Sequence, residues 1–235
     1  MNNKKAGFFA GLATLLATEA EGARPMVTDD ARIVDSKACQ VESWVKRNRD
    51  STEFWALPAC NPTGNVELTF GGARTRENGE DAFTDHVVQA KTIFHALETN
   101  GWGIGLAAGT IRHPRRDVAN GWPGDTYFYV PASFSYADDF WVLHLNAGVT
   151  RRRDQDRNLA TWGVGNEIKL RDDLFFIPEI FHSDVGRPFY QIGMRYWIVK
   201  DRLQTDMTFG NRATSDTSER WFSIGLRILS PPFLP

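Results

Sequence analysis

The stretch GWGIGLAAGTIR, residues 101–112, alternates between large apolar side chains and almost bare positions. One parity carries Trp102, Ile104, Leu106, Ala108 and Thr110, and the other carries Gly103, Gly105, Ala107 and Gly109. Successive side chains of a β-strand point to opposite faces, so the stretch predicts a strand with one apolar face and one face against a crowded space. The mean hydropathy of the chain is −0.37. That value fits a membrane location if only every second residue of each strand meets lipid, as in a transmembrane β-barrel.

The same period of two recurs along most of the chain. It is clear in NVELTF (65–70), FWVLHLNAGVT (140–150) and WFSIGLRIL (221–229). About twelve such segments follow one another, most of them near the ten-residue length of a tilted membrane strand. They begin near residues 38, 51, 64, 83, 101, 126, 140, 158, 173, 187, 202 and 219. The pattern predicts an all-β fold, an antiparallel up-and-down transmembrane β-barrel of about twelve strands.

The connections between these segments provide an independent test. Outer-membrane barrels alternate short periplasmic turns with longer extracellular loops. The even-numbered connections read NPTG, ETN, ADD, RDD and KDR, which are short and carry turn-forming residues. The odd-numbered ones include TRENGEDA, HPRRDVANGWPGD, RRRDQDR and NRATSDTSE, while RNRD and HSDVGRP are shorter than expected. The alternation supports the barrel and predicts that the first strand runs outward.

Two other all-β architectures stay open at this point. A soluble barrel such as a lipocalin also alternates, but it turns its apolar face inward and its other face is richly charged. Here the second face is often Gly, Asn, Ser or Thr, with sparse charges of both signs. An irregular β-sandwich is the third choice, because about twelve evenly spaced strands exceed its usual size.

The beginning of the chain has the pattern of an export signal. Lys4 and Lys5 precede the apolar run AGFFAGLATLLA, and Ala20-Glu21-Gly22 places small residues at the cleavage-critical positions. We therefore expect a signal peptide over 1–22, a periplasmic or lumen segment over 23–37 and the barrel over 38–235. The 27 basic and 29 acidic residues are nearly balanced, which argues against a nucleic-acid partner.

The first hairpin predicts a disulfide. One register places Lys46 opposite Glu53, Trp44 opposite Trp55 and Cys39 opposite Cys60, so an ion pair, an aromatic pair and a cysteine pair coincide. A directly opposed pair can bring its Cβ atoms within disulfide range. Because the periplasm is oxidising, we expect a Cys39–Cys60 disulfide near the periplasmic rim. The alternative is two unlinked small residues that face lipid.

The inward parity of the predicted strands also carries charged side chains and two histidines. They are Glu42, Lys46, Glu53, Glu67, Lys91, His95, His144, Glu167, Lys169, Glu179, Arg195, Asp206 and Arg227. Mixed signs facing one lumen can neutralise each other in a packed network of salt bridges. They could equally line a narrow polar channel whose selectivity they tune.

No catalytic, metal or cofactor site is expected. The adjacent His182 and Ser183 suggest a hydrolase, but neighbours on a regular strand point to opposite faces and could not cooperate there. The five histidines show no ligand spacing. The glycines of residues 101–109 belong to a strand with no helix after it, so they form no phosphate-binding loop.

The segment before the barrel resembles a known family. Arg24-Pro25 and Val27-Thr28-Asp29-Asp30-Ala31 resemble the opening of the bacterial family named for a MetA-pathway of phenol degradation, and Ile177-Pro178-Glu179 and Leu203-Gln204-Thr205-Asp206 look similar to it too. The resemblance implies an outer-membrane barrel associated with the degradation of aromatic compounds, and it transfers no catalytic residues. The cysteine hairpin is not a feature of that family as a whole. We further expect this segment to plug the barrel partly, with Arg24, Asp29, Asp30 and Arg32 meeting lumen charges; the alternative is a disordered lead-in.

These features predict a monomeric protein of the bacterial outer membrane, folded into its lipid by the barrel-insertion machinery. Its expected role is the passive passage or binding of a small solute, with an aromatic or apolar compound suggested by the resemblance alone. The competing class is a non-transporting barrel for surface structure or for partner binding through the 113–125 loop. A lipid or ester hydrolase is the third class.

Overall fold

A computed structural model describes residues 26–114, 124–183, 185–214 and 219–235. Within these residues the chain is all-β and has no helix long and apolar enough to cross a membrane. The strands are β1 (Cys39–Asn48), β2 (Ser51–Cys60), β3 (Val66–Glu77), β4 (Phe83–His95), β5 (Trp102–Arg112), β6 (Asp125–Tyr136), β7 (Trp141–Arg152), β8 (Arg157–Arg171), β9 (Leu174–Phe176), β10 (Glu179–His182), β11 (Phe189–Val199), β12 (Leu203–Arg212) and β13 (Trp221–Leu229).

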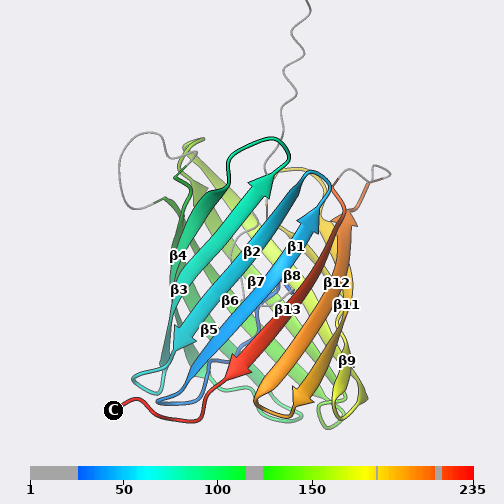
Figure 1. Ribbon diagram of the computed structural model, residues 1–235. Coiled ribbons are helices and arrows are strands. Elements are labelled where there is room, and N and C mark those ends of the chain that lie inside the picture. The colour runs from blue at the N-terminus through cyan, green and yellow to red at the C-terminus, as the bar shows by residue number, and fades with distance from the viewer. Residues whose placement is uncertain (1–25, 115–123, 184, 215–218) are drawn as a thin grey trace, which may run out of the picture.

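The strands form one closed antiparallel sheet (Figure 1). Apart from β9 and β10, each strand pairs with its neighbour in sequence, and β13 pairs with β1, so the sheet closes on itself. The short strands β9 and β10 both lie between β8 and β11 and keep the same register to each of them. They therefore make up one strand position, interrupted only at Ile177 and Pro178, and the predicted barrel of twelve strands is confirmed.

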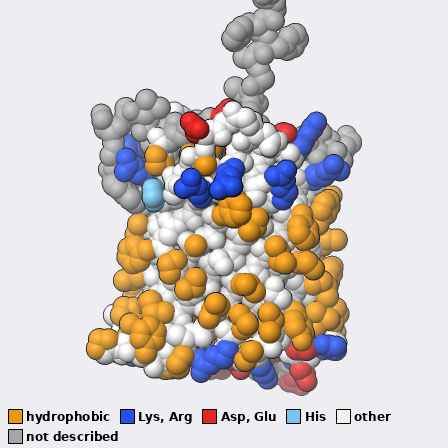
Figure 2. Space-filling view, viewed as in Figure 1, with side chains coloured by type: hydrophobic (Ala, Val, Ile, Leu, Met, Phe, Trp, Pro, Cys, Tyr) orange, Lys and Arg blue, Asp and Glu red, His pale blue; other side chains and the backbone are white. Residues whose placement is uncertain are grey.

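The side chains sort by parity into an apolar outside and a tightly filled inside. Figure 2 shows hydrophobic side chains in a broad band around the visible face of the barrel. Phe94 is 67% exposed on the outside, whereas Ala107 is fully buried on the inside. In the strand of residues 102–112 the bare parity faces inward, and a Cβ on Gly109 would lie 2.4 Å from the hydroxyl of Tyr127. The small residues of this strand thus make room for the side chains of its neighbours.

The short turns lie at the end of the barrel opposite the β1–β2 turn, which we call the short-turn end. They follow the predicted chemistry. Asn100, Asp138, Asp139 and Asp201 adopt positive φ, the backbone conformation that short polar residues tolerate best. Partial burial opposes the ionisation of Asp139, but hydrogen bonds from the hydroxyls of Ser135 and Thr99 outweigh it and hold the pKa of this carboxyl below its ordinary value. The long loops lie at the opposite end, as the alternation predicts.

The first hairpin has the register predicted from its sequence. Cys39 pairs with Cys60, Trp44 with Trp55 and Lys46 with Glu53. Cys39 and Cys60 form a disulfide with their Cα atoms 4.0 Å apart, and the two tryptophan rings stack with centroids 5.2 Å apart. The disulfide therefore closes the hairpin at the short-turn end.

Candidate functional site

The interior of the barrel is the candidate site, and the chain segment 26–38 enters it, with only Asp35 and Ser36 of this segment exposed. Met26, Asp30, Ala31, Val34 and Ala38 are at most 3% exposed. Five backbone amides of this segment donate to side chains of the barrel wall. The donor and acceptor pairs are Val27 and Thr28 to Glu179 (2.8 Å each), Asp29 to Asn146 (2.7 Å), Ala31 to Ser133 (2.8 Å) and Val34 to Glu67 (2.9 Å). These acceptors belong to β3, β6, β7 and β10, so the segment is held from several sides.

Lys91 of β4 forms the main electrostatic contact with this segment. Its ammonium lies 2.7 Å from the Asp29 carboxylate and 3.5 Å from that of Asp30. Asp29 also accepts a hydrogen bond from the hydroxyl of Tyr129 at 2.7 Å. The Asn146 amide donates to the backbone oxygen of Asp29 at 2.8 Å and so binds this residue at two points. Buried charges are costly unless they are paired and hydrogen-bonded, and here both conditions are met.

A second charged cluster joins the segment to β8, β11 and β12. Arg195 pairs with Glu167 and donates to Asp206, with an Nη2–Oδ2 distance of 2.8 Å. Arg32 extends from the segment to the same Glu167, with a nitrogen–oxygen distance of 3.7 Å, and pairs with Asp30 at 3.5 Å. The guanidiniums and carboxylates thus form one network that includes the segment.

A third group of polar side chains lies on the wall where β13 meets β1. Arg227 pairs with Glu42 at 3.2 Å and donates to the Gln40 amide oxygen at 2.7 Å. On the same wall, nearer the long-loop end, the Lys46 ammonium lies 4.7 Å from the centre of the Trp221 ring, and Lys46 pairs in register with Glu53. Gln40 also donates to Glu67 of β3 at 3.1 Å, and the same carboxylate accepts the amide of Val34, so Glu67 links this group to the segment.

Apolar side chains also line the interior. One cluster on β2–β6 consists of Trp55, Leu57, Ala73, Val87, Ala107, Ile111, Tyr127 and Tyr129, with Trp44 packed against it. A second cluster combines Phe181, Phe189 and Trp221 with Val27 of the segment. Together the two clusters give the lumen an aromatic character that its charges alone do not suggest.

The structure places ten of the thirteen lumen candidates in the buried interior, and Arg227 is half-buried among them. Those ten are Glu42, Lys46, Glu53, Glu67, Lys91, His144, Glu167, Glu179, Arg195 and Asp206. Lys169 lies at the short-turn end, where its ammonium donates to the backbone oxygen of Asp138. Arg24 lies outside the described residues, as does the predicted signal peptide over 1–22.

The prediction for His95 is wrong. Its side chain is exposed and stacks on Trp102, with ring centroids 4.1 Å apart, on the outside of the barrel. The pairing of β4 with β5 shifts register between Ile93 and His95. A bulge of this kind adds one residue to a strand and reverses the parity beyond it. Strict alternation in the sequence therefore assigned His95 to the wrong face.

Sequence reasoning missed several uncharged groups that hold the segment. Ser133, Asn146 and Tyr129 bond to it directly, and Asn61 donates to the backbone oxygen of Val34 at 2.8 Å. A search by charge passes over such residues. Their inward parity in the predicted strands of residues 126–136 and 140–150 was the available signal for three of them.

The interior shows one arrangement that resembles catalytic machinery. The Ser133 hydroxyl lies 2.8 Å from Nδ1 of His144, whose Nε2 lies 3.7 Å from a Glu167 oxygen. The hydroxyl also accepts the amide hydrogen of Ala31 and is fully buried beneath the segment. The three side chains therefore position the segment in this structure.

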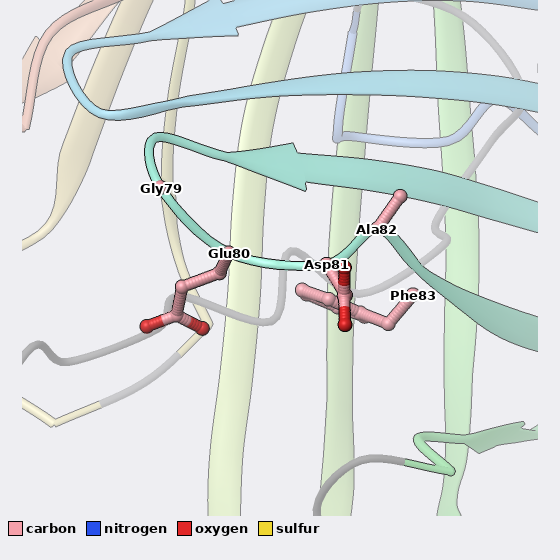
Figure 3. Close-up of a pocket in the computed structure, with 5 residues that line it drawn as sticks. All are labelled: Gly79, Glu80, Asp81, Ala82 and Phe83. Carbon is pink, nitrogen blue, oxygen red and sulfur yellow. The ribbon is translucent and has the colours of Figure 1, made fainter.

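The pair suggested as a hydrolase is not assembled. His182 bonds to the backbone oxygen of Gly186 at an exposed position and stacks beside Trp162, while Ser183 is buried. In the described part of the chain, no group of three or more His, Cys, Asp or Glu side chains is placed to hold a metal ion. A wide, open depression of about 830 Å³ lies instead at the β3–β4 loop, lined by residues 79–83. Figure 3 shows the carboxylates of Glu80 and Asp81 projecting from the same side of this loop.

The fold is that of the outer-membrane porins and channels. The KdgM porin in complex with disordered oligogalacturonate is similar over 80% of this chain and 98% of its own, with a TM-score of 0.60 at 9% sequence identity. The NanC porin has a TM-score of 0.58 at 10% identity over 81% of this chain and 98% of its own. The COG4313 outer membrane channel from Pseudomonas putida F1 has a TM-score of 0.54 at 11% identity over 85% of this chain and 97% of its own.

By sequence the chain belongs to the family described as Uncharacterised conserved protein UCP029691, whose model matches residues 10–229. No curated protein matches the sequence. The description of this family names no activity, and the resemblance to the family named for a MetA-pathway of phenol degradation rests on the short motifs given above.

Proposed function

We propose that this chain is an exported protein of the bacterial outer membrane that passes or binds a small solute through a lumen partly plugged by residues 26–38. The closed sheet supports this proposal because it leaves no unpaired strand edge, as a membrane-spanning β-structure requires. The apolar outer band and the porin-like fold support it as well. We further propose that the barrel is a monomer, placed in outer-membrane lipid by the barrel-insertion machinery, and that it has no catalytic role.

The observation that carries the proposal is the way in which the segment is held. Its amides bond to side chains of the wall, and its Asp29 and Asp30 pair with Lys91. Every one of these bonds can break without opening a single bond of the barrel sheet. A segment docked in this way can leave the lumen while the barrel stays folded, which is the property that a removable plug needs.

The aromatic clusters of the interior favour an aromatic or apolar solute. Trp55, Tyr127 and Tyr129 on one wall and Phe181, Phe189 and Trp221 on the other offer ring faces that an aromatic solute could contact once the segment has moved. This agrees with the solute class that the MetA-pathway resemblance implies. The KdgM porin binds oligogalacturonate in its complex. The aromatic walls of the present lumen favour an aromatic or apolar solute instead.

Planar-bilayer conductance tests the proposal. The mature protein should show rare, small openings, and a variant without residues 26–36 should show frequent, larger ones, because that deletion removes Asp29, Asp30 and Arg32 from the lumen. Heat-modifiable migration on a gel serves as the control that both proteins are folded barrels. Equal conductance of the two folded proteins would contradict the plug, and a mature protein that is soluble in water without detergent would contradict the membrane location.

A second function is favoured by a specific observation, the burial of the inward side chains. Polar groups at the centre of the barrel such as Gln191, Gln204 and His144 are 1% exposed. A non-transporting barrel, serving surface structure or partner binding through the 113–125 loop, would have such a filled interior. It predicts a well-folded barrel that stays silent in bilayers both with and without residues 26–36.

A further inference from the structure

The outer wall of β1–β5 carries a group of basic side chains, four arginines and one histidine, near the long-loop end. We name Arg47, Arg74, Arg76, His86 and Arg112 the outer basic patch; their parity places all five on the outside of the barrel. Strand pairing makes the group continuous. On the outer face Arg47 lies opposite Thr52, which lies opposite Arg76, while Arg74 lies opposite Thr84 and His86 opposite Arg112.

Within the described part of the chain, the arginines of the patch have no acidic partner. Among the residues that the structure describes, none of its four arginines forms an ion pair, and Arg47 bonds only to the Thr52 hydroxyl. Glu53 and Asp85 on the neighbouring strands have the opposite parity and are buried inside, and Glu77 of β3 shares the inward parity. The exposed Glu80 and Asp81 lie beyond the strands, on the β3–β4 loop. On the far wall the situation differs, because Arg151 at the loop end of β7 pairs with Asp156 at 2.6 Å.

The patch borders the apolar band of the barrel. Val45 and Phe54, the next outward residues below it, are exposed hydrophobic side chains. Arg76 lies over the ring of Phe54, with its guanidinium carbon 5.7 Å from the ring centre. Figure 2 shows Lys and Arg side chains in a row directly above the hydrophobic side chains on the face that β1–β4 form in Figure 1. The outward side chains at the same end of β11–β13 include Tyr190, Phe209 and Phe222, so the basic character does not extend all around the barrel.

We propose that the outer basic patch binds the phosphate groups of a phosphorylated glycolipid in the leaflet at the long-loop end. Arginine binds phosphate with two parallel hydrogen bonds, and the Thr52 and Thr84 hydroxyls can donate beside it. The acyl chains of such a lipid would lie along Val45, Phe54 and the apolar band below. The site goes beyond the proposed function: it depends on the membrane location and not on whether the lumen conducts.

Native mass spectrometry of the detergent-solubilised mature protein tests the site. The probes are lipid A with two phosphates, the same lipid with its phosphates removed, and inorganic phosphate alone. The test variant carries Arg47→Gln, Arg74→Gln and Arg76→Gln, and the matched control is Arg151→Gln, which removes one arginine at the same end of the barrel from the opposite wall. Each basic side chain near an anionic lipid surface is worth about fivefold in affinity, so the triple variant should bind diphosphorylated lipid A on the order of 100-fold more weakly.

The outcomes are distinct. The wild-type protein and Arg151→Gln should retain diphosphorylated lipid A about equally and bind the dephosphorylated lipid much more weakly. Equal retention of lipid A by the triple variant, or equal binding of the two lipids by the wild type, would refute the site. Binding of inorganic phosphate without binding of lipid A would show a free-anion site and would also refute it. If the triple variant does not fold, Arg47→Gln and Arg74→Gln are measured singly, with a loss of about fivefold expected for each.

Discussion

Replacing Lys91 with methionine should release the segment 26–38 from the lumen while the barrel stays folded. Methionine preserves much of the length of the lysine stem and removes the ammonium. Asp29 and Asp30 then lose the cation that lies 2.7 and 3.5 Å from their carboxylates, at positions only 7% and 2% exposed. Glu67, which lies opposite Lys91 in the register of β3 and β4, loses a positive neighbour as well.

The magnitude follows from the burial of these groups. Removing one partner of a buried ion pair costs roughly 3 to 5 kcal/mol, because the other partner is left buried and uncompensated. The two aspartates belong to the segment and can return to water by undocking, so the cost acts on docking rather than on the sheet. A change of this size shifts the docked-to-undocked ratio by about 10² to 4 × 10³.

Amide hydrogen exchange of the folded protein in detergent measures this ratio directly. The amides of Val27, Thr28, Asp29, Ala31 and Val34 donate to wall side chains, so each is protected only while the segment is docked. In Lys91→Met the exchange of these amides should accelerate by about 10² to 4 × 10³, whereas the exchange of the strand amides should be unchanged.

Lys46→Met is the matched control, since Lys46 is also buried in the lumen but contacts Glu53 and Trp221 instead of the segment. It should leave the exchange of these amides unchanged. Adding Asp29→Asn to Lys91→Met removes one of the stranded carboxylates and should restore part of the protection. Unchanged exchange in Lys91→Met, or equal acceleration in Lys46→Met, would refute the assignment of Lys91 as the main anchor of the segment.

Three further outcomes are expected. Gly163→Ala should accelerate the amide hydrogen exchange of the segment, because a Cβ on residue 163 would lie 2.4 Å from the Thr28 hydroxyl. Adding Thr28→Ala should reverse part of this acceleration. Unchanged exchange in Gly163→Ala would contradict this packing. Replacing Cys39 and Cys60 with serine should lower the free energy of unfolding by about 3 kcal/mol, measured by urea titration of tryptophan fluorescence, because the disulfide joins residues 21 positions apart; an unchanged midpoint would contradict it. Asp139→Asn should destabilise the barrel at neutral pH: the pKa of Asp139 is lowered by folding, so its contribution is complete above the unfolded value of about 3.9 and is lost as the pH falls through the folded pKa. The difference in the free energy of unfolding between wild type and Asp139→Asn should therefore vanish at pH values below the folded pKa of Asp139. A difference that persists at those pH values would refute the role of the carboxylate.

The sequence predicted the barrel well because its determinants are local. Period-two alternation fixes which face of each strand is apolar, and turn chemistry fixes where the chain reverses. The first hairpin shows this most clearly, since the Cys39–Cys60, Trp44–Trp55 and Lys46–Glu53 pairs all follow from a single register. The same rule failed at His95, because a bulge reverses parity without any signal in the alternation.

The sequence by itself thus determined the all-β class, the positions of the strands, the disulfide pairing and the inward parity of the lumen charges. Only the tertiary structure decided which of those charges meet one another. It brought Lys91 to Asp29 and Glu179 to the amides of Val27 and Thr28, which lie more than 150 positions away in the chain. It also showed that the bare face of residues 101–112 makes room for neighbours such as Tyr127. The physical reason is that parity depends on adjacent residues, whereas contacts across a lumen depend on barrel closure, strand tilt and the path of a segment with no periodicity of its own.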